Sequence, residues 1–179
     1  MDQTIDPVDS PDAYRDSLLA ALGDEDPAAV QSRTTEALRA LVTDAGELLR
    51  VRPGPGDWSV LECIGHITDG ELVVAGRERW ILAEDLPEIV GYDQALWVDR
   101  LEHNADDPAL LIELFAAIRR SNLDLWARRT AADRERIGRH RERGDESYGL
   151  TFRLAAGHDL IHLAQARRAL ETVGRSRTR

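Results

Sequence analysis

Residues 150–173 read LTFRLAAGHDLIHLAQARRALETV, and their spacing is the clearest indication of a helical fold. Apolar positions such as Leu154 recur at steps of three and four residues, which is typical of an amphipathic helix that buries one face. His158 and His162 fall on the same stripe, about one helical turn apart, so their imidazoles face the same neighbour. We expect Gly174 to end this helix.

Three more long amphipathic helices are expected upstream, each opened by a recognisable start signal. Two begin with an aspartate followed by proline, and one begins with the capping box Ser59-Val-Leu-Glu62. A shorter helix, from Pro11 to Gly23, precedes them. The expected long helices cover residues 26–49, 59–83 and 107–125, with a Pro- and Gly-rich break at 52–57, a long connection at 86–107 that contains a short helix, and a polar, arginine-rich loop at 128–145.

Strand signals are weak, because hairpin dipeptides and β-branched alternating runs are scarce. The sequence therefore predicts an all-α protein, an antiparallel four-helix bundle with a long connection between its second and third helices. We expect the bundle domain to span residues 25–175, after an N-terminal segment of residues 1–24 that holds the short helix.

Composition argues against several classes of partner. The net charge of −10 disfavours nucleic acid, which needs a basic face. No apolar run is long enough for a membrane span, and residues 1–10 lack the layout of a signal peptide, so a cytoplasmic location is expected. The single cysteine, Cys63, cannot form an internal disulfide and is interpreted as a small buried residue.

The helical stripes carry three of the five histidines. His66 lies on the inner stripe of the helix expected at 59–83, and His158 and His162 lie on that of the last helix. Three neutral imidazoles that converge would form a facial divalent-metal site with an open position. The alternative, that these are surface or satisfied core histidines, stays open. His103 and His140 are expected to face solvent.

Several nearby acidic side chains have candidate supporting roles. Glu62, Asp69 and Asp159 could hold a ligating imidazole by its other nitrogen. Each could equally be a solvated charge on a helix surface. No separate general base stands out from the sequence.

Two segments together resemble the DinB-like family. They are Trp58-Ser-Val-Leu-Glu-Cys-Ile-Gly-His66-Ile67 and His158-Asp-Leu-Ile-His162-Leu-Ala-Gln165. The resemblance implies an antiparallel four-helix bundle that holds zinc or nickel on three histidines, which by position are His66, His158 and His162. It also implies a homodimer, and relatives that transfer the thiols bacillithiol or mycothiol.

The leading hypothesis is a metal-dependent enzyme acting on a small molecule, either a thiol S-transferase using a low-molecular-weight thiol or a related hydrolase. Trp58, Tyr92 and Trp97 are the expected pocket wall, because the long connection would roof the site. The alternative is a non-catalytic stress-response protein that binds a metal or a small ligand. A fourth protein ligand, such as Cys63 or Asp69, would favour a structural metal.

Overall fold

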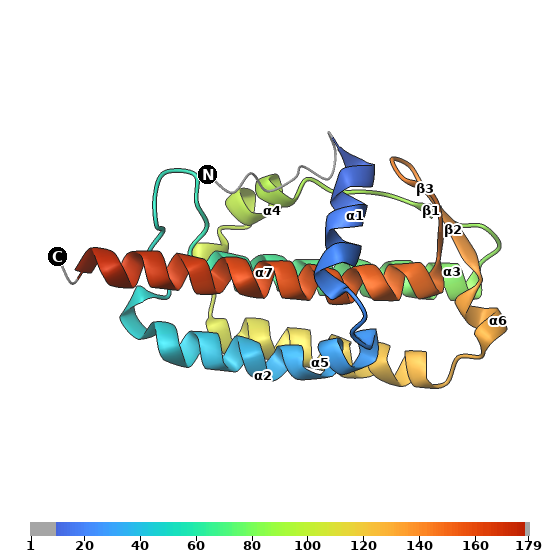
Figure 1. Cartoon of the computed structure of the whole chain (residues 1–179), viewed down its shortest axis with the longest axis horizontal. Helices are drawn as coiled ribbons and strands as arrows, with labels where there is room; N and C mark the ends of the chain where they lie inside the picture. The colour runs from blue at the N-terminus through green and yellow to red at the C-terminus, as the bar shows by residue number, and fades with distance from the viewer. Residues whose placement is uncertain (1–9, 178–179) are drawn as a thin grey trace.

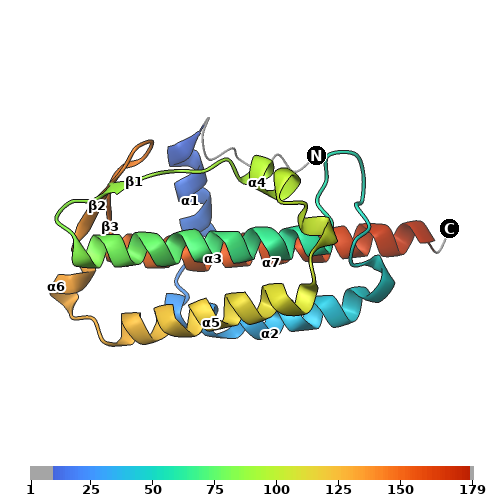
Figure 2. The same cartoon turned by 180° about the vertical axis from the view of Figure 1, so that it is seen from behind.

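Four long helices form the body of the protein in the computed structural model, which describes residues 10–177. They are α2 (Pro27–Ala45), α3 (Val60–Ala83), α5 (Pro108–Ala127) and α7 (Tyr148–Arg177). They lie side by side, as Figures 1 and 2 show, so the predicted four-helix bundle is confirmed.

The long connection sets the direction of the third bundle helix. Figure 2 shows this segment returning along the bundle, so that α5 runs parallel to α3, while α7 runs antiparallel to α3. The connection contains β1 (Glu88–Ile89), the short helix α4 (Gln94–Arg100) and the 3₁₀ turn η2 (His103–Ala105). A polypeptide that returns before starting the next helix produces two parallel helices, which a short loop cannot do.

Side-chain caps fix the helix starts where the sequence predicts them. Asp26 accepts hydrogen bonds from the backbone N–H groups of Ala28 and Ala29. Ser59 and Glu62 form the complete capping box at the start of α3. Each cap satisfies backbone donors that a helix leaves free at its first turn, so these local signals suffice to position the helix starts.

The short N-terminal helix α1 (Pro11–Leu22) crosses α7 at close range. A Cβ added at Gly157 would lie 2.1 Å from the carbonyl oxygen of Leu18, so only glycine permits this approach of the two backbones. Tyr14, Leu18 and Leu154 form a small apolar cluster beside the crossing. The first helix is therefore packed onto the bundle; the domain boundary after residue 24 stays a prediction.

The arginine-rich stretch predicted as a loop contains ordered structure. It forms α6 (Ala131–Arg134) and a hairpin of β2 (Ile137–His140) and β3 (Gly144–Ser147). β2 pairs in parallel with β1 and antiparallel with β3. These strands could not be predicted from alternating apolar residues, because the buried positions of β2 are Gly138 and His140.

The end of α7 also differs from the prediction. The helix continues through Gly174 to Arg177 instead of stopping at the glycine. A single glycine inside a helix costs only about 1 kcal/mol relative to alanine, and no proline follows to force a stop.

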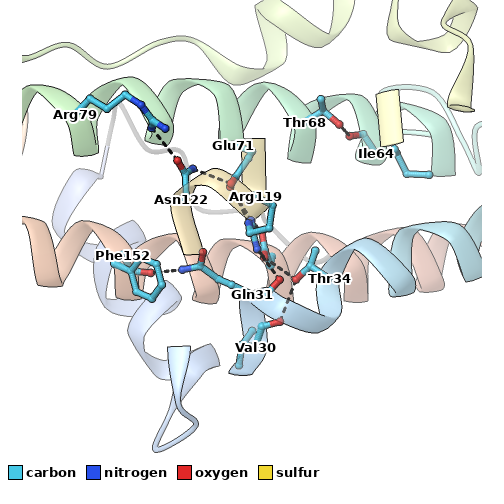
Figure 3. Close-up of polar contacts among 11 residues, drawn as sticks. Val30, Gln31, Thr34, Ile64, Thr68, Glu71, Arg79, Arg119, Asn122 and Phe152 are labelled. Atoms are coloured by element: carbon cyan, nitrogen blue, oxygen red, sulfur yellow. Dashed lines mark hydrogen bonds and ion pairs between the residues drawn. The ribbon is translucent and has the colours of Figure 1, made fainter. Parts of the chain in front are cut away.

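The bundle interior has an apolar part and a charged layer. The main apolar cluster includes Leu38, Leu61, Phe115 and Leu163, contributed by all four long helices. The charged layer is centred on Arg119, shown in Figure 3. No helix within residues 10–177 combines the length and the apolar character needed to cross a membrane.

Candidate metal centre

The structure brings His66, His158 and His162 together between α3 and α7. The Nε2 atom of His66 lies 2.9 Å from Nε2 of His158 and 3.2 Å from Nε2 of His162. The three potential ligand atoms lie within 4.8 Å of one another. A tetrahedral ion with nitrogen bonds of about 2.0–2.1 Å separates its ligands by roughly 3.3 Å, so this spacing suits a first-row divalent ion.

Hydrogen bonding among the imidazoles cannot explain this geometry. Nε2 of His66 carries either one proton or one lone pair, so it can make only one of its two imidazole contacts as a hydrogen bond. The remaining contact would set two lone pairs, or two protons, against each other. A cation at the point of convergence satisfies all three lone pairs, and the residues therefore fit a divalent metal.

Burial keeps the three imidazoles in the form that binds metal. Loss of solvent lowers the pKa of His66 and His158 well below the usual 6.5, and neighbouring imidazoles add to the effect. Burial also lowers the pKa of His162, to about 4. All three side chains are neutral at physiological pH, so the site needs no deprotonation before it accepts an ion.

Gln165 orients one of the imidazoles. Its Oε1 atom lies 2.8 Å from Nδ1 of His162, which leaves Nε2 of that ring free to bind an ion. This role of Gln165 was not predicted, because carboxylates were the expected partners, although the three-residue spacing from His162 was a usable signal.

The three acidic candidates have other partners. Glu62 pairs with Arg52 and completes the helix cap. Asp69 contacts Nε2 of His103 at 2.7 Å. Asp159 bonds to Arg119 inside the bundle. The prediction that these carboxylates hold the ligating imidazoles is wrong, since each is committed to a separate cation or ring.

Arg119 on α5 links the other three long helices of the bundle by hydrogen bonds. All five of its N–H groups have acceptors: two on Glu71, two on Asp159 and the carbonyl oxygen of Gln31. Thr34 donates to the same Asp159 carboxylate at 2.7 Å. Asp159 lies between His158 and His162 in sequence, so this network fixes the rotation of α7 that presents both rings to His66.

The prediction that His103 and His140 face solvent is wrong, because both are buried. The His103 ring lies between Asp69 and Asp106, with both contacts at 2.7 Å, and it rests on Gly65. A Cβ at Gly65 would lie 2.4 Å from this ring. The hydrogen bond to the Asp69 carboxylate raises the pKa of His103. The same contact attaches the long connection, which carries His103, to α3.

The described residues supply no fourth protein ligand to the cluster. Cys63 lies in the apolar core, where burial raises the pKa of its thiol to about 12. Asp69 is engaged by His103. Three neutral ligands leave a coordination position for an exchangeable molecule, which is the arrangement of catalytic sites.

The three aromatic residues expected in the pocket wall occupy different places. The Trp58 ring centroid lies 5.0 Å from that of His66, so this indole covers one side of the cluster. Tyr92 lines a cavity that His158 also lines. Trp97 packs against Tyr92, with ring centroids 4.5 Å apart. Their binding of substrate stays a prediction.

Glycine lets the two histidine-bearing helices approach. A Cβ at Gly70 would lie 2.9 Å from Cε1 of His158. The absent side chain makes room for this imidazole beside α3, and the adjoining cavity has a volume of about 70 Å³. That volume exceeds the ~10–15 Å³ needed for one water, so the cavity can admit part of a small organic molecule.

Comparisons with known proteins agree with this architecture. The DinB superfamily profile matches residues 28–166. A protein of Oceanobacillus iheyensis named "Putative metal-dependent hydrolase" is 28% identical over 109 residues, or 61% of this chain and 63% of that relative, so the match spans less than two thirds of the relative's length.

Among solved structures, YfiT from Bacillus subtilis matches with a TM-score of 0.76 at 18% identity, covering 91% of this chain and 89% of YfiT. YfiT is described as "a probable metal-dependent hydrolase with an unusual four-helix bundle topology". At this level of identity the match shows a shared fold. Because the profile spans most of the bundle, the chain belongs to the DinB superfamily.

Proposed function

We propose that this protein is a metal-dependent enzyme whose divalent ion is held by His66, His158 and His162. The observation that carries the proposal is the convergence of three neutral nitrogens with no fourth protein ligand among the described residues. A bound divalent ion supplies the positive charge that lowers the pKa of a thiol or a water. Zinc and nickel are the proposed ions, since both accept imidazole ligands.

The first candidate reaction is transfer of a low-molecular-weight thiol to an electrophilic small molecule. Three neutral ligands leave the charge of the ion undiminished, which favours a bound thiolate. The indole of Trp58 covers one side of the cluster. Cys63 does not serve as the nucleophile in this proposal, because its thiol is buried in the core.

The second candidate reaction is hydrolysis. It is favoured by the names of the two similar proteins, both described as metal-dependent hydrolases. The same open position would admit water in place of a thiol. A non-catalytic role in binding a metal or small ligand is the remaining alternative, and it predicts that no substrate turns over.

Metal analysis tests the site before any reaction is sought. Untagged protein, purified without chelator, should carry about one divalent ion per chain by elemental mass spectrometry, and His158→Ala should lose it. His140→Ala is the matched control, since His140 is buried outside the cluster. Absence of bound metal in the parent, even after incubation with zinc and nickel, would overturn the proposal.

Turnover then separates the candidate reactions. Metal-loaded protein is supplied with a bimane electrophile and a panel of thiols, and in parallel with nitrophenyl esters and no thiol. Thiol-dependent conjugation that His158→Ala abolishes supports the transferase, and ester cleavage without thiol supports the hydrolase. A metal-loaded protein that catalyses neither would favour the binding role.

We also propose that the protein forms a homodimer. Its proposed location is the cytoplasm, and we propose that it binds no nucleic acid. The exposed apolar side chains Leu72 and Trp80 on α3 support a second copy as their cover. Light scattering should give twice the chain mass, and Trp80→Glu should give the monomer. A monomeric parent would contradict the proposed dimer.

A further inference from the structure

A cavity adjoins the metal centre on the side away from Trp58. His158 and Gly70 line one part of it, and Arg77, His140 and Thr151 line another. Its lining residues come from α3 and α7, from α1, from the long connection and from the β2–β3 hairpin. It is therefore the space into which the non-reacting part of a substrate would extend.

Three residues that line this cavity each have a buried polar atom without a hydrogen-bond partner among the described residues. These atoms are Nε of Arg77, Nε2 of His140 and Oγ1 of Thr151, on α3, β2 and α7. Buried polar groups in folded proteins are nearly always paired, so each exception calls for an explanation. Three exceptions around one cavity indicate an absent polar ligand or water. The Nε–H of Arg77 can only donate and the hydroxyl of Thr151 can donate, so the ligand atoms that these two contact are acceptors. Nε2 of His140 carries a lone pair when Nδ1 donates to Oε2 of Glu142, 2.9 Å away, so it pairs with a donor such as water and not with the same acceptor.

Arg77 is the cation available to such a ligand. Its Nη2 donates to the carbonyl oxygen of Val90 at 2.9 Å, which holds the guanidinium in place. No carboxylate pairs with it among residues 10–177. The neighbouring Arg143, by contrast, is already paired with Glu146, with Nη2 3.1 Å from Oε2.

The other charges favour a singly charged ligand. Glu142 lies at the cavity with Oε2 2.9 Å from Nδ1 of His140, and about one third of its side chain is exposed. Together with Glu146, it would repel a doubly charged phosphate more strongly than a carboxylate. A carboxylate also matches the donor geometry of a guanidinium.

We propose that Arg77 and Thr151 form a subsite for a carboxylate at the end of the substrate remote from the metal. This inference rests on the proposed function, because it assigns the reacting end to the His158 side of the cavity. Thr151 lies seven residues before His158 on α7, and Arg77 lies eleven residues beyond His66 on α3. Along the helix axes these backbone spacings are roughly 10 Å and 16 Å, and we take the shorter one, from Thr151 to His158, as the span of the substrate.

Binding by metal-free protein tests the subsite independently of catalysis. Calorimetry or NMR titration with hexanoate and its neutral match hexanol should show at least about tenfold tighter binding of hexanoate, as expected for a charge-assisted hydrogen bond. Arg77→Gln should remove that preference, and Arg77→Lys should restore part of it. Arg141→Gln is the matched control, because Arg141 is exposed and pairs with Glu88.

A second variant tests the subsite in case Arg77→Gln does not fold. Thr151→Val keeps the shape and removes the hydroxyl, so it should weaken hexanoate binding several-fold while circular dichroism stays native. Equal binding of hexanoate and hexanol, or full retention of the preference in Arg77→Gln, would overturn the subsite. No saturable binding of hexanoate would mean that water alone occupies the cavity, which also overturns it.

Chain-length dependence tests the link to the metal. Zinc-loaded protein should bind ω-mercapto carboxylates with an affinity that peaks near the six-carbon acid, whose extended length suits the ~10 Å spacing. Shorter and longer acids should bind at least several-fold more weakly, and the peak should vanish in Arg77→Gln. A preference for hexanoate without bound zinc would leave the subsite standing while the proposed function fails.

Discussion

Glu78 gives a prediction whose magnitude follows from its surroundings. Its side chain is 0% exposed on α3, and neither carboxylate oxygen has a hydrogen-bond partner among the described residues. Burial, with a contribution from the charge of Glu71, raises the pKa of Glu78 to about 8 from a usual 4.5. At neutral pH the folded protein therefore keeps a proton that the unfolded chain releases.

The sign of the effect follows from that difference. As pH rises from the unfolded pKa towards the folded pKa, the unfolded state gains relative stability, at about 1.4 kcal/mol per pH unit. Between pH 5 and pH 8 the parent should lose about 3 kcal/mol of unfolding free energy through this group alone. Glu78→Gln removes the titrating group, so between pH 5 and pH 8 the unfolding free energy of this variant should fall by about 3 kcal/mol less than that of the parent.

Urea unfolding at several pH values measures this difference directly. The informative quantity is the change in the gap between the parent and Glu78→Gln with pH, because the buried amide adds its own constant desolvation cost. Glu113→Gln, an exposed change on α5, is the control and should track the parent. Parallel curves for the parent and Glu78→Gln would show that the pKa of Glu78 is not raised in the folded protein and that water reaches the carboxylate.

Other changes probe the supports of the metal centre. Arg119→Met should cost about 3–5 kcal/mol in urea unfolding, because it strands the buried carboxylates of Glu71 and Asp159; a loss below about 1 kcal/mol would contradict the network's role. His103→Gln should reduce stability most below pH 6.5, since a raised pKa stabilises the fold there and its contribution disappears as pH rises through the folded value; a gap from the parent that does not vary with pH would count against this. Gln165→Leu should weaken zinc binding about 10- to 100-fold in a competition titration against a chelating dye; unchanged affinity would show that His162 needs no partner.

Local signals explain which parts of the fold were predictable. Helix starts at Asp26, Ser59 and Asp107 depend on side chains that bond backbone groups two or three residues away, so sequence alone reveals them. The hairpin at 137–147 was missed because its inward positions are glycine, histidine and glutamate. Its order comes from pairing with Glu88 and Ile89, about fifty residues earlier in the chain.

In the candidate site, too, the features set by local spacing were predictable and those set by distant contacts were not. Helical spacing predicted that His158 and His162 share a face, and the stripe containing His66 made the third imidazole a reasonable ligand. The absence of a carboxylate partner for these rings was not predictable, because Asp159 bonds to Arg119, forty residues away, and to Thr34, 125 residues away. The unpaired donor on Arg77 is likewise visible only when every neighbour is in place.

The helices, their buried faces and the three histidines that cluster could therefore be predicted before the fold was known. Periodicity specifies a face because side chains three and four residues apart must point the same way. What each face contacts is visible only in the folded protein: the distances of 2.9 and 3.2 Å between imidazole nitrogens, the pairing of Asp159 with Arg119, and the cavity beside His158. These depend on contacts between distant segments, which helical spacing along the chain does not encode.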